Sequence, residues 1–155
     1  MSKQRLRLWL RLLRTFRAVE EELRERLRVG FDTTLPKFDV MAALDRMPAG
    51  MTMTELSRFL MVSNGNVTGI IDRLVAEGVV VRRPHEDDRR AIFVQLTPKG
   101  ARQFAAMAEA HEAWVNEILG HFSVREIKTM LALLSIPRFK SRRLAIKQQE
   151  ASHVQ

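Results

Sequence analysis

The chain of 155 residues contains no cysteine. This absence excludes disulfide scaffolds, thiolate zinc sites, cysteine nucleophiles and thiol-based redox sensing, because each of them needs the cysteine sulfur. No internal repeat and no low-complexity linker divides the sequence. The length fits one domain or two small subdomains, and the core of a single chain of this size is modest, which favours oligomerisation.

Long apolar runs are lacking as well. No run of about 18 uncharged apolar residues occurs, so the sequence predicts no transmembrane helix. The opening segment, MSKQRLRLWLRLLRTFRAVEEELRERLR, is not a secretory signal, because arginines interrupt every apolar stretch and no small-residue cleavage site follows. An amphipathic helix at a membrane surface is the alternative for this segment. Its glutamates are unlike a transit peptide, and we expect a soluble, cytoplasmic protein with no membrane partner.

Acidic residues are the minority among the charged ones. Lys and Arg number 26 against 18 Asp and Glu, which gives a formal net charge of +8 and a pI of about 10.9. Hydrophobic residues make up 46% and charged residues 28%, a composition typical of a globular domain. The positive excess favours an anionic partner: nucleic acid, a membrane surface or an acidic ligand.

Apolar periodicity predicts a mainly helical chain. A first helix covers about residues 3–29, and Gly30 suits the position after its end. The apolar residues of this helix recur at steps of three and four, with one step skipped: Leu6, Trp9, Leu13, Phe16, Leu23 and Leu27. A second helix begins at Pro36 and stops before Pro48, with an expected buried set of Phe38, Val40, Met41 and Leu44.

Capping patterns and alternation predict the remaining elements. Two short helices follow, one with the capping-box pair Thr52 and Glu55, the other running from the N-cap Ser63 to about Glu77. Strands are expected at residues 79–81 and 92–96, joined by the charged turn HEDDRR. The last elements are a long helix that starts at Thr97 and Pro98, and a helix capped by Ser123 and Glu126 that Pro137 ends.

The helix that follows Ser63 has two unlike faces. Val67, Ile70, Ile71 and Leu74 share the face expected to be buried. The opposite face is small and polar, with Gly65, Thr68, Gly69, Asp72 and Ala76, flanked by Asn66 and Arg73. Small residues permit close approach to a DNA groove, and Asn, Ser and Thr bind phosphates or base edges. An ordinary capped surface helix explains the pattern about equally well.

The hairpin that follows carries charges of both signs at its turn. Arginines at such a tip can enter an A·T-rich minor groove. Aspartates would be repelled by phosphate unless they pair with arginine, so we expect Asp88 to orient an arginine across the base of the hairpin. A solvated turn is the simpler alternative.

Taken together, the segment TELSRFLMVSNGNVTGIIDRLVAEGVVVRRPHEDDRRAIFVQLTPKG resembles the winged helix-turn-helix of the MarR family of bacterial transcription regulators. The family pattern D-x-R…L-T…G is met by Asp88, Arg90, Leu96, Thr97 and Gly100, and V-T-x-I-I-D-R-L by residues 67–74. The segment PKFDVMAAL also resembles the family's second helix. The resemblance covers about residues 36–105, and the flanking helices agree in position and length.

The resemblance implies a homodimer in which the terminal helices of two copies intertwine and each copy offers one winged lobe to half of a pseudo-palindromic operator in double-stranded DNA. It carries the DNA contacts over to these residues: Ser63, Asn64, Asn66, Thr68, Arg73, Arg89 and Arg90. Gly69 departs from the family pattern, since many members have a long polar or basic residue there, and a contact to DNA would be missing at this position.

The resemblance also implies a small-molecule effector that releases the DNA. The expected lining comes from the first, second and long fifth helices: Trp9, Leu13, Phe16, Phe38, Met41, Phe104, Met107 and His111. Aromatic and methionine side chains suit an adaptable apolar pocket. We expect an aromatic acid, a phenol or a CoA-type thioester. Packing in an ordinary core is the alternative for this set.

The predicted architecture is mainly α with a small β-hairpin wing, in three parts: residues 1–35 for dimerisation, 36–97 for DNA binding and 98–155 for completing the dimerisation region. The predicted function is a ligand-responsive DNA-binding transcription regulator, with repression as the expected sign. A non-specific architectural DNA-binding protein is the alternative. We expect no enzyme, because the four histidines lack metal-ligand spacing and no catalytic motif occurs, and no cofactor or metal.

Overall fold

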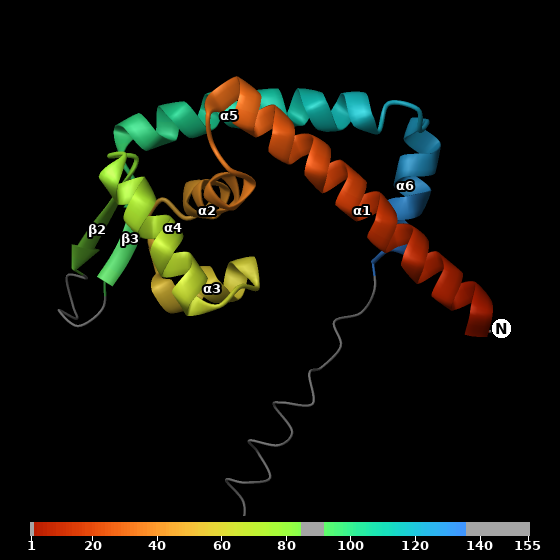
Figure 1. The fold of residues 1–155 in the computed structure, drawn as a ribbon, viewed down its shortest axis with the longest axis horizontal. Helices are drawn as coiled ribbons and strands as arrows, with labels where there is room; N and C mark the ends of the chain where they lie inside the picture. Colours follow the sequence, from red (N-terminus) through yellow and green to blue (C-terminus); the bar gives the residue numbers. More distant parts are fainter. Residues whose placement is uncertain (1, 85–91, 136–155) are drawn as a thin grey trace, which may run out of the picture. The chain divides into compact units, whose positions relative to one another are not determined.

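A computed structural model describes residues 2–84 and 92–135 of the chain, which divides into two compact units, Met1–Ile118 and Leu119–Gln155. The mainly helical architecture with a small sheet is confirmed (Figure 1). The predicted division into three functional parts stays a prediction. Within the described ranges, no helix is long and apolar enough to cross a membrane.

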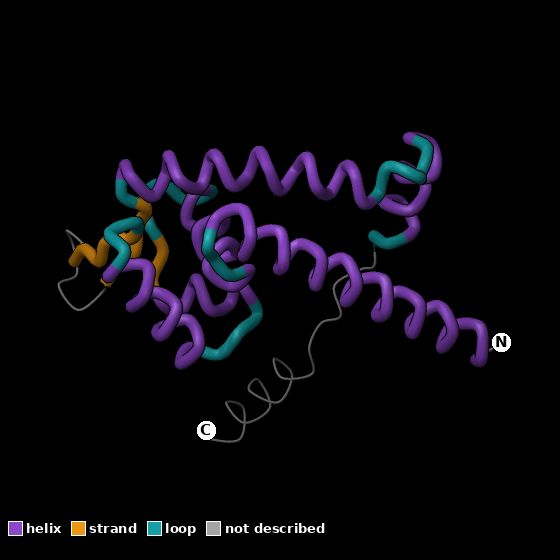
Figure 2. Tube along the Cα trace, turned by 45° about the horizontal axis from the view of Figure 1, so that its top comes forward, coloured by secondary structure: helices purple, strands orange, loops and turns teal. Residues whose placement is uncertain are grey.

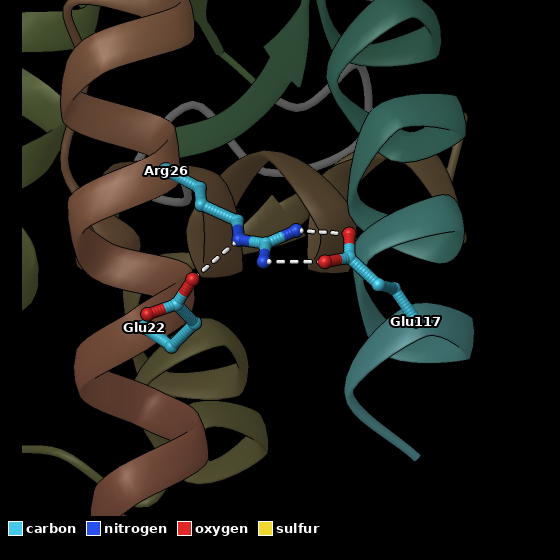
Figure 3. A network of polar contacts seen from close by, with 3 residues as sticks. All are labelled: Glu22, Arg26 and Glu117. Atoms are coloured by element: carbon cyan, nitrogen blue, oxygen red, sulfur yellow. Dashed lines mark hydrogen bonds and ion pairs between the residues drawn. The ribbon is translucent and has the colours of Figure 1, made fainter. Parts of the chain in front are cut away.

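Helix α1 (Ser2–Phe31) carries arginines and glutamates three or four residues apart along its C-terminal half. Ion pairs join Arg24 to Glu20 and Arg28 to Glu25. Arg26 bonds to Glu22 and reaches across to Glu117 of helix α5 (Pro98–Ile118) with two bonds of 2.7 and 3.1 Å (Figure 3). Arg26 therefore ties the two longest helices of the first unit together.

The expected helix end at Gly30 is wrong. The helix runs through Gly30 to Phe31, and Asp32 takes the left-handed conformation with φ 48°. Its backbone N–H donates to the Arg28 carbonyl at 3.1 Å. Aspartate tolerates this conformation better than most side chains, so the glycine is not needed there. Gly30 lies instead against the ring of Trp114, which also meets Phe31 edge-on at 6.1 Å.

The core of the first unit is built around helix α2 (Leu35–Asp45). Thr34 caps it by accepting a hydrogen bond from the Lys37 backbone N–H, and proline occupies its first turn. The four residues expected to be buried are buried: Phe38, Val40, Met41 and Leu44. Helix α2 packs on α5 and on the next two helices, so one core supports both the long helices and the winged lobe, defined here as residues 35–96.

Helices α3 (Met53–Leu60) and α4 (Asn64–Ala76) form the helix-turn-helix. The predicted capping box is present, since Thr52 and Glu55 bond reciprocally at the start of α3. The turn holds Met61 in the left-handed conformation, and the buried Ser57 hydroxyl donates to the Val62 carbonyl at 2.6 Å. These bonds set the angle at which α4 leaves the turn.

The sheet has three antiparallel strands in the described residues, in the order β1–β3–β2. Figure 2 shows the strands in orange. Strand β3 (Ile92–Leu96) has its predicted bounds. Strand β2 (Val80–Pro84) begins later and runs three residues further than the predicted 79–81, because pairing with β3 carries arginines and a proline into the strand. Strand β1 (Met51–Thr52) was not expected, since two residues are too few to show alternation.

Gly100 explains how α5 joins the sheet. A Cβ atom built there would lie 2.0 Å from the Val79 carbonyl oxygen. The Thr97 hydroxyl donates to the Gly78 carbonyl at 2.9 Å and accepts from the Gly100 N–H at 3.0 Å. The threonine and the glycine of the L-T…G pattern are therefore needed for one close backbone crossing.

The second unit is described from Leu119 to Ser135 and contains helix α6 (Val124–Leu133). The predicted capping box of Ser123 and Glu126 is present. Several of its large apolar side chains are exposed: Val124, Leu131, Leu133 and Leu134. Pro137, expected to end this helix, lies outside the described residues.

Candidate nucleic-acid interface

Helix α4, called the recognition helix from here on, buries one face and exposes the other. Val67, Ile71 and Leu74 are 0 to 1% exposed and form part of the core. Ser63, Asn64, Asn66, Thr68 and Arg73, the residues predicted to touch DNA on this helix, are all exposed. The expected division of the helix into an apolar and a small polar face is thus present, and the contacts themselves remain predictions.

Two hydroxyls on the recognition helix already have partners within it. The Ser63 oxygen accepts from the Asn66 backbone N–H at 3.4 Å, and the Thr68 hydroxyl donates to the Asn64 carbonyl at 2.9 Å. Each oxygen keeps a lone pair for a further donor. The Ser63 hydroxyl also keeps its own hydrogen, so this residue, the two asparagine side chains and Arg73 are the groups of this face that can donate to phosphate or base edges.

Gly65 and Gly69 leave the polar face open. A Cβ atom built on either residue would meet nothing within 4 Å. Neither glycine is therefore required by packing inside the protein. Because glycine weakens a helix interior by roughly 1 kcal/mol relative to alanine, both positions lower the stability of the recognition helix without improving its fit to the core. This cost suits a surface that another molecule approaches closely.

A groove of about 620 Å³ runs beside the recognition helix. Helix α1, the start of α2 and α4 all contribute to its lining: Arg24, Thr34, Pro36, Lys37, Val62, Gly65, Asn66, Gly69, Ile70 and Arg73. Three of these residues are cationic, and two of the three are ion-paired, Arg24 with Glu20 and Lys37 with Glu77. The third, Arg73, forms no ion pair within the described residues, so its guanidinium group can bind an anionic group.

An ion pair joins the recognition helix to the hairpin. Arg82 of strand β2 donates to the Asp72 carboxylate. We expected Asp88 to orient an arginine at this place, but Asp88 lies outside the described residues together with Arg89 and Arg90. Asp72 therefore holds an arginine at the base of the wing, a role that its exposed position on a helix did not reveal in the sequence.

The residues predicted to hold an effector fall into two groups. Phe38, Met41, Phe104 and Met107 are at most 8% exposed and belong to the core. His111 stacks on Phe38 with a centroid distance of 4.6 Å, and Phe104 lies 5.5 Å from the same ring. The other three residues lie on α1, where Trp9 and Phe16 are exposed and Leu13 is partly buried. The effector role of this set stays a prediction.

Burial changes the proton affinity of His111. Loss of hydration lowers the pKa of its imidazole below the usual value of 6.5, because the charged form loses more than the neutral form. His111 is therefore neutral at physiological pH. One ring nitrogen can donate a hydrogen bond while the other accepts one.

Comparison with known proteins decides the family. The model of the MarR family matches residues 31–91, from the last residue of α1 to the residue before strand β3. A MarR family transcriptional regulator from Silicibacter pomeroyi has the same fold with a TM-score of 0.74 and 34% sequence identity, over 86% of this chain and 91% of that chain.

The chain belongs to the MarR family.

Two further members bear on this chain. The transcriptional activatory protein BadR from Rhodopseudomonas palustris is 36% identical over 104 residues, which cover 65% of this chain and 59% of BadR. The match to this curated relative thus spans about three fifths of its length. A mutant MarR from E. coli, solved in complex with operator DNA, has a TM-score of 0.71 and 30% identity over 80% of this chain and 89% of that one.

Proposed function

We propose that this MarR-family chain is a DNA-binding transcription regulator that reads an operator through the recognition helix and the wing. The observation that supports it most directly is the exposed polar face of α4, with two open glycines, in a lobe whose fold is shared with a MarR bound to operator DNA. The groove beside this face contains Arg73, which forms no ion pair within the described residues and can therefore bind phosphate.

We propose further that two copies act together. The first half of α1 exposes large apolar side chains that a protomer alone leaves in water, Leu6, Leu8, Trp9 and Phe16, with 56 to 64% of each exposed. A surface of this kind marks a protein interface. A two-fold dimer would present two winged lobes to half-sites about one helical turn of DNA apart.

A small-molecule effector is the third part of the proposal, in the class of aromatic acids, phenols or their CoA-type thioesters. His111 supports it, because its ring is only partly buried at the edge of the core, so its imidazole can bond to one polar group of a ligand while Phe38 packs on its face. We propose that the protein represses transcription and that this ligand relieves the repression.

Gel-shift titration tests the proposal. The probe is the DNA upstream of the gene for this chain, and a scrambled duplex of equal length is the comparison. We expect affinity for the upstream DNA to exceed that for the scrambled duplex by about 1,000-fold or more at physiological salt. Equal affinities would overturn the regulator and leave the non-specific architectural protein.

One variant ties the result to the recognition helix. Arg73→Gln should weaken operator binding by about tenfold or more, the cost of losing one good contact to DNA. Lys128→Gln removes the same charge from exposed α6 and serves as the control. A thermal-shift screen of aromatic acids, phenols and their CoA thioesters then tests the effector, and a melting temperature unchanged by all of them would refute this ligand class.

A further inference from the structure

The first half of α1 carries only one sign of charge. Residues 2–19 include Lys3, Arg5, Arg7, Arg11, Arg14 and Arg17 and no acidic residue. Five of the six cations, all but Arg5, fall within an arc of about 120° when the helix is projected at 100° per residue. We call these five residues the basic stripe: Lys3, Arg7, Arg11, Arg14 and Arg17. Every one of them is exposed.

The basic stripe has no counterions within the part of the chain that is described. Every arginine of the same helix after residue 19 pairs with a glutamate: Arg24 with Glu20, Arg26 with Glu22, and Arg28 with Glu25. No such pair is formed by the stripe residues, whose nearest acidic residue along the helix is Glu20. Within this one helix, only the arginines and the lysine of the N-terminal part therefore lack acidic partners.

The placement of these cations works against the helix itself. Like charges at a spacing of four residues repel one another, and cations near a helix N-terminus oppose the helix dipole. The first turn of α1 has no acidic residue to offset this. A local arrangement that weakens its own element is expected where the residues serve a binding function.

The spacing of the stripe matches a phosphate backbone. Arg7, Arg11 and Arg14 line a shallow hollow of about 200 Å³ together with Leu10. They span about 10 Å along the helix, over which one strand of duplex DNA presents roughly three phosphates. Arginine is also the side chain best suited to phosphate, because its planar fork donates two parallel hydrogen bonds.

The apolar residues of α1 favour DNA over a membrane as the occupant. Trp9 and Phe16 lie on the side of the helix opposite the stripe, in line with Leu23 and Leu27, which are buried against the core. Protein can therefore cover the apolar side while the stripe stays in solvent. A membrane-surface helix would instead need its apolar side in the lipid.

We propose that the basic stripe is a second, sequence-independent DNA site, which binds the sugar–phosphate backbone of duplex DNA outside the sequence read by the winged lobe. This inference rests on the proposed function for the role of DNA. Within the first unit, the N-terminal end of α1, which carries the stripe, points away from the wing in both views (Figures 1 and 2).

The test uses the full chain and a random-sequence duplex of about 60 base pairs. Fluorescence anisotropy measures the binding affinity over a range of salt concentrations. The triple variant Arg7→Gln, Arg11→Gln, Arg14→Gln should bind this duplex at least tenfold more weakly. Its salt slope should fall by about 2.7, because three phosphate contacts are lost. The matched control removes three exposed arginines that lie off α1 and form no ion pair within the described residues: Arg46→Gln, Arg102→Gln, Arg125→Gln.

Three outcomes would overturn the inference. The triple variant and the control could show the same salt slope. The triple variant alone could lose flotation with anionic phosphatidylserine vesicles while its DNA binding is unchanged, which would assign the stripe to a membrane. Sedimentation could show that only the triple variant changes its assembly state. Failure of the operator preference would refute the proposed regulator but would leave the random-duplex comparison readable.

Discussion

Gly100 and Gly69 are glycines for different reasons, and this difference is testable at the scale of single residues. A methyl group at Gly100 would collide with the Val79 carbonyl, whereas one at Gly69 would project into open space. We expect Gly100→Ala to lower the free energy of unfolding by about 1–3 kcal/mol, because backbone must move to admit the methyl group. Urea denaturation measures the change.

Gly69→Ala is the matched comparison for that variant. Alanine in a helix interior should raise the free energy of unfolding by roughly 0.5–1 kcal/mol. If the recognition helix approaches DNA as proposed, the same methyl group should weaken operator binding although the fold is more stable. Equal stability of the two alanine variants would contradict the close crossing at Gly100.

His111 gives the fold a dependence on pH. Its pKa is lowered in the folded state, so the unfolded chain binds more protons at this residue in mild acid. Above the unfolded pKa near 6.5, titration of His111 leaves the free energy of unfolding unchanged. Below it, this titration lowers the free energy of unfolding progressively as the pH falls. His111→Phe should flatten the loss of stability between about pH 7 and 5. Urea titrations at several pH values measure the free energy of unfolding of the unchanged chain, of His111→Phe and of the comparison variant His121→Phe. If the pH dependence of His111→Phe is the same as that of the unchanged chain, burial of His111 does not have this role.

At the scale of elements, most of the fold could be predicted from local chemistry. The capping boxes at Thr52 and Ser123 identify the starts of α3 and α6, because each side chain satisfies a backbone group at a fixed spacing. Strand β1 and the end of β2 could not be predicted, since they depend on pairing with β3 across the sheet. Long-range hydrogen bonds leave no periodic signal in a single sequence.

The candidate site shows the same limit. The polar face of α4 follows from helical periodicity, but the partner of Arg82 does not, because Asp72 and Arg82 lie on different elements. The groove is likewise lined by three helices, and the sequence pattern indicates only the residues that α4 contributes. Contacts between elements need the tertiary arrangement, which the sequence pattern does not contain.

The Asp72–Arg82 pair should position the wing relative to the recognition helix. Asp72→Asn removes a negative charge near DNA, and electrostatics alone would make operator binding tighter. If the pair orients Arg82, binding should instead become about three- to tenfold weaker. The free energy of unfolding should change by less than about 1 kcal/mol, because both side chains are partly exposed.

A double-mutant cycle separates these two effects. Asp72→Asn, Arg82→Gln and the double variant are compared by gel shift on one operator. Coupling predicts that the double variant is no weaker than Arg82→Gln alone. Additive losses, or tighter binding by Asp72→Asn, would show that the pair does not position the wing.

At the scale of the whole molecule, apolar surface is distributed unevenly. The core of the first unit is centred on α2 and the winged lobe, while the first half of α1 contributes no residue to it. The sequence predicts the apolar stripe of α1 but not which of its residues the protomer itself buries. Of the six periodic apolar residues of α1, only Leu23 and Leu27 are buried. Which of the six the protomer buries could be known only from the tertiary structure.

A substitution at Phe16 tests whether a second copy covers the exposed apolar residues of α1. Its side chain is 64% exposed, so Phe16→Asp should leave the fold of the protomer intact. A charge buried in a dimer interface would be costly, and we expect a monomer by sedimentation velocity with the melting of the winged lobe preserved. Operator affinity should fall by about 100-fold or more, because the two lobes no longer bind as one unit. Thr15→Asp adds the same charge one residue away on a different face and should remain dimeric. An intact Phe16→Asp dimer would refute the interface.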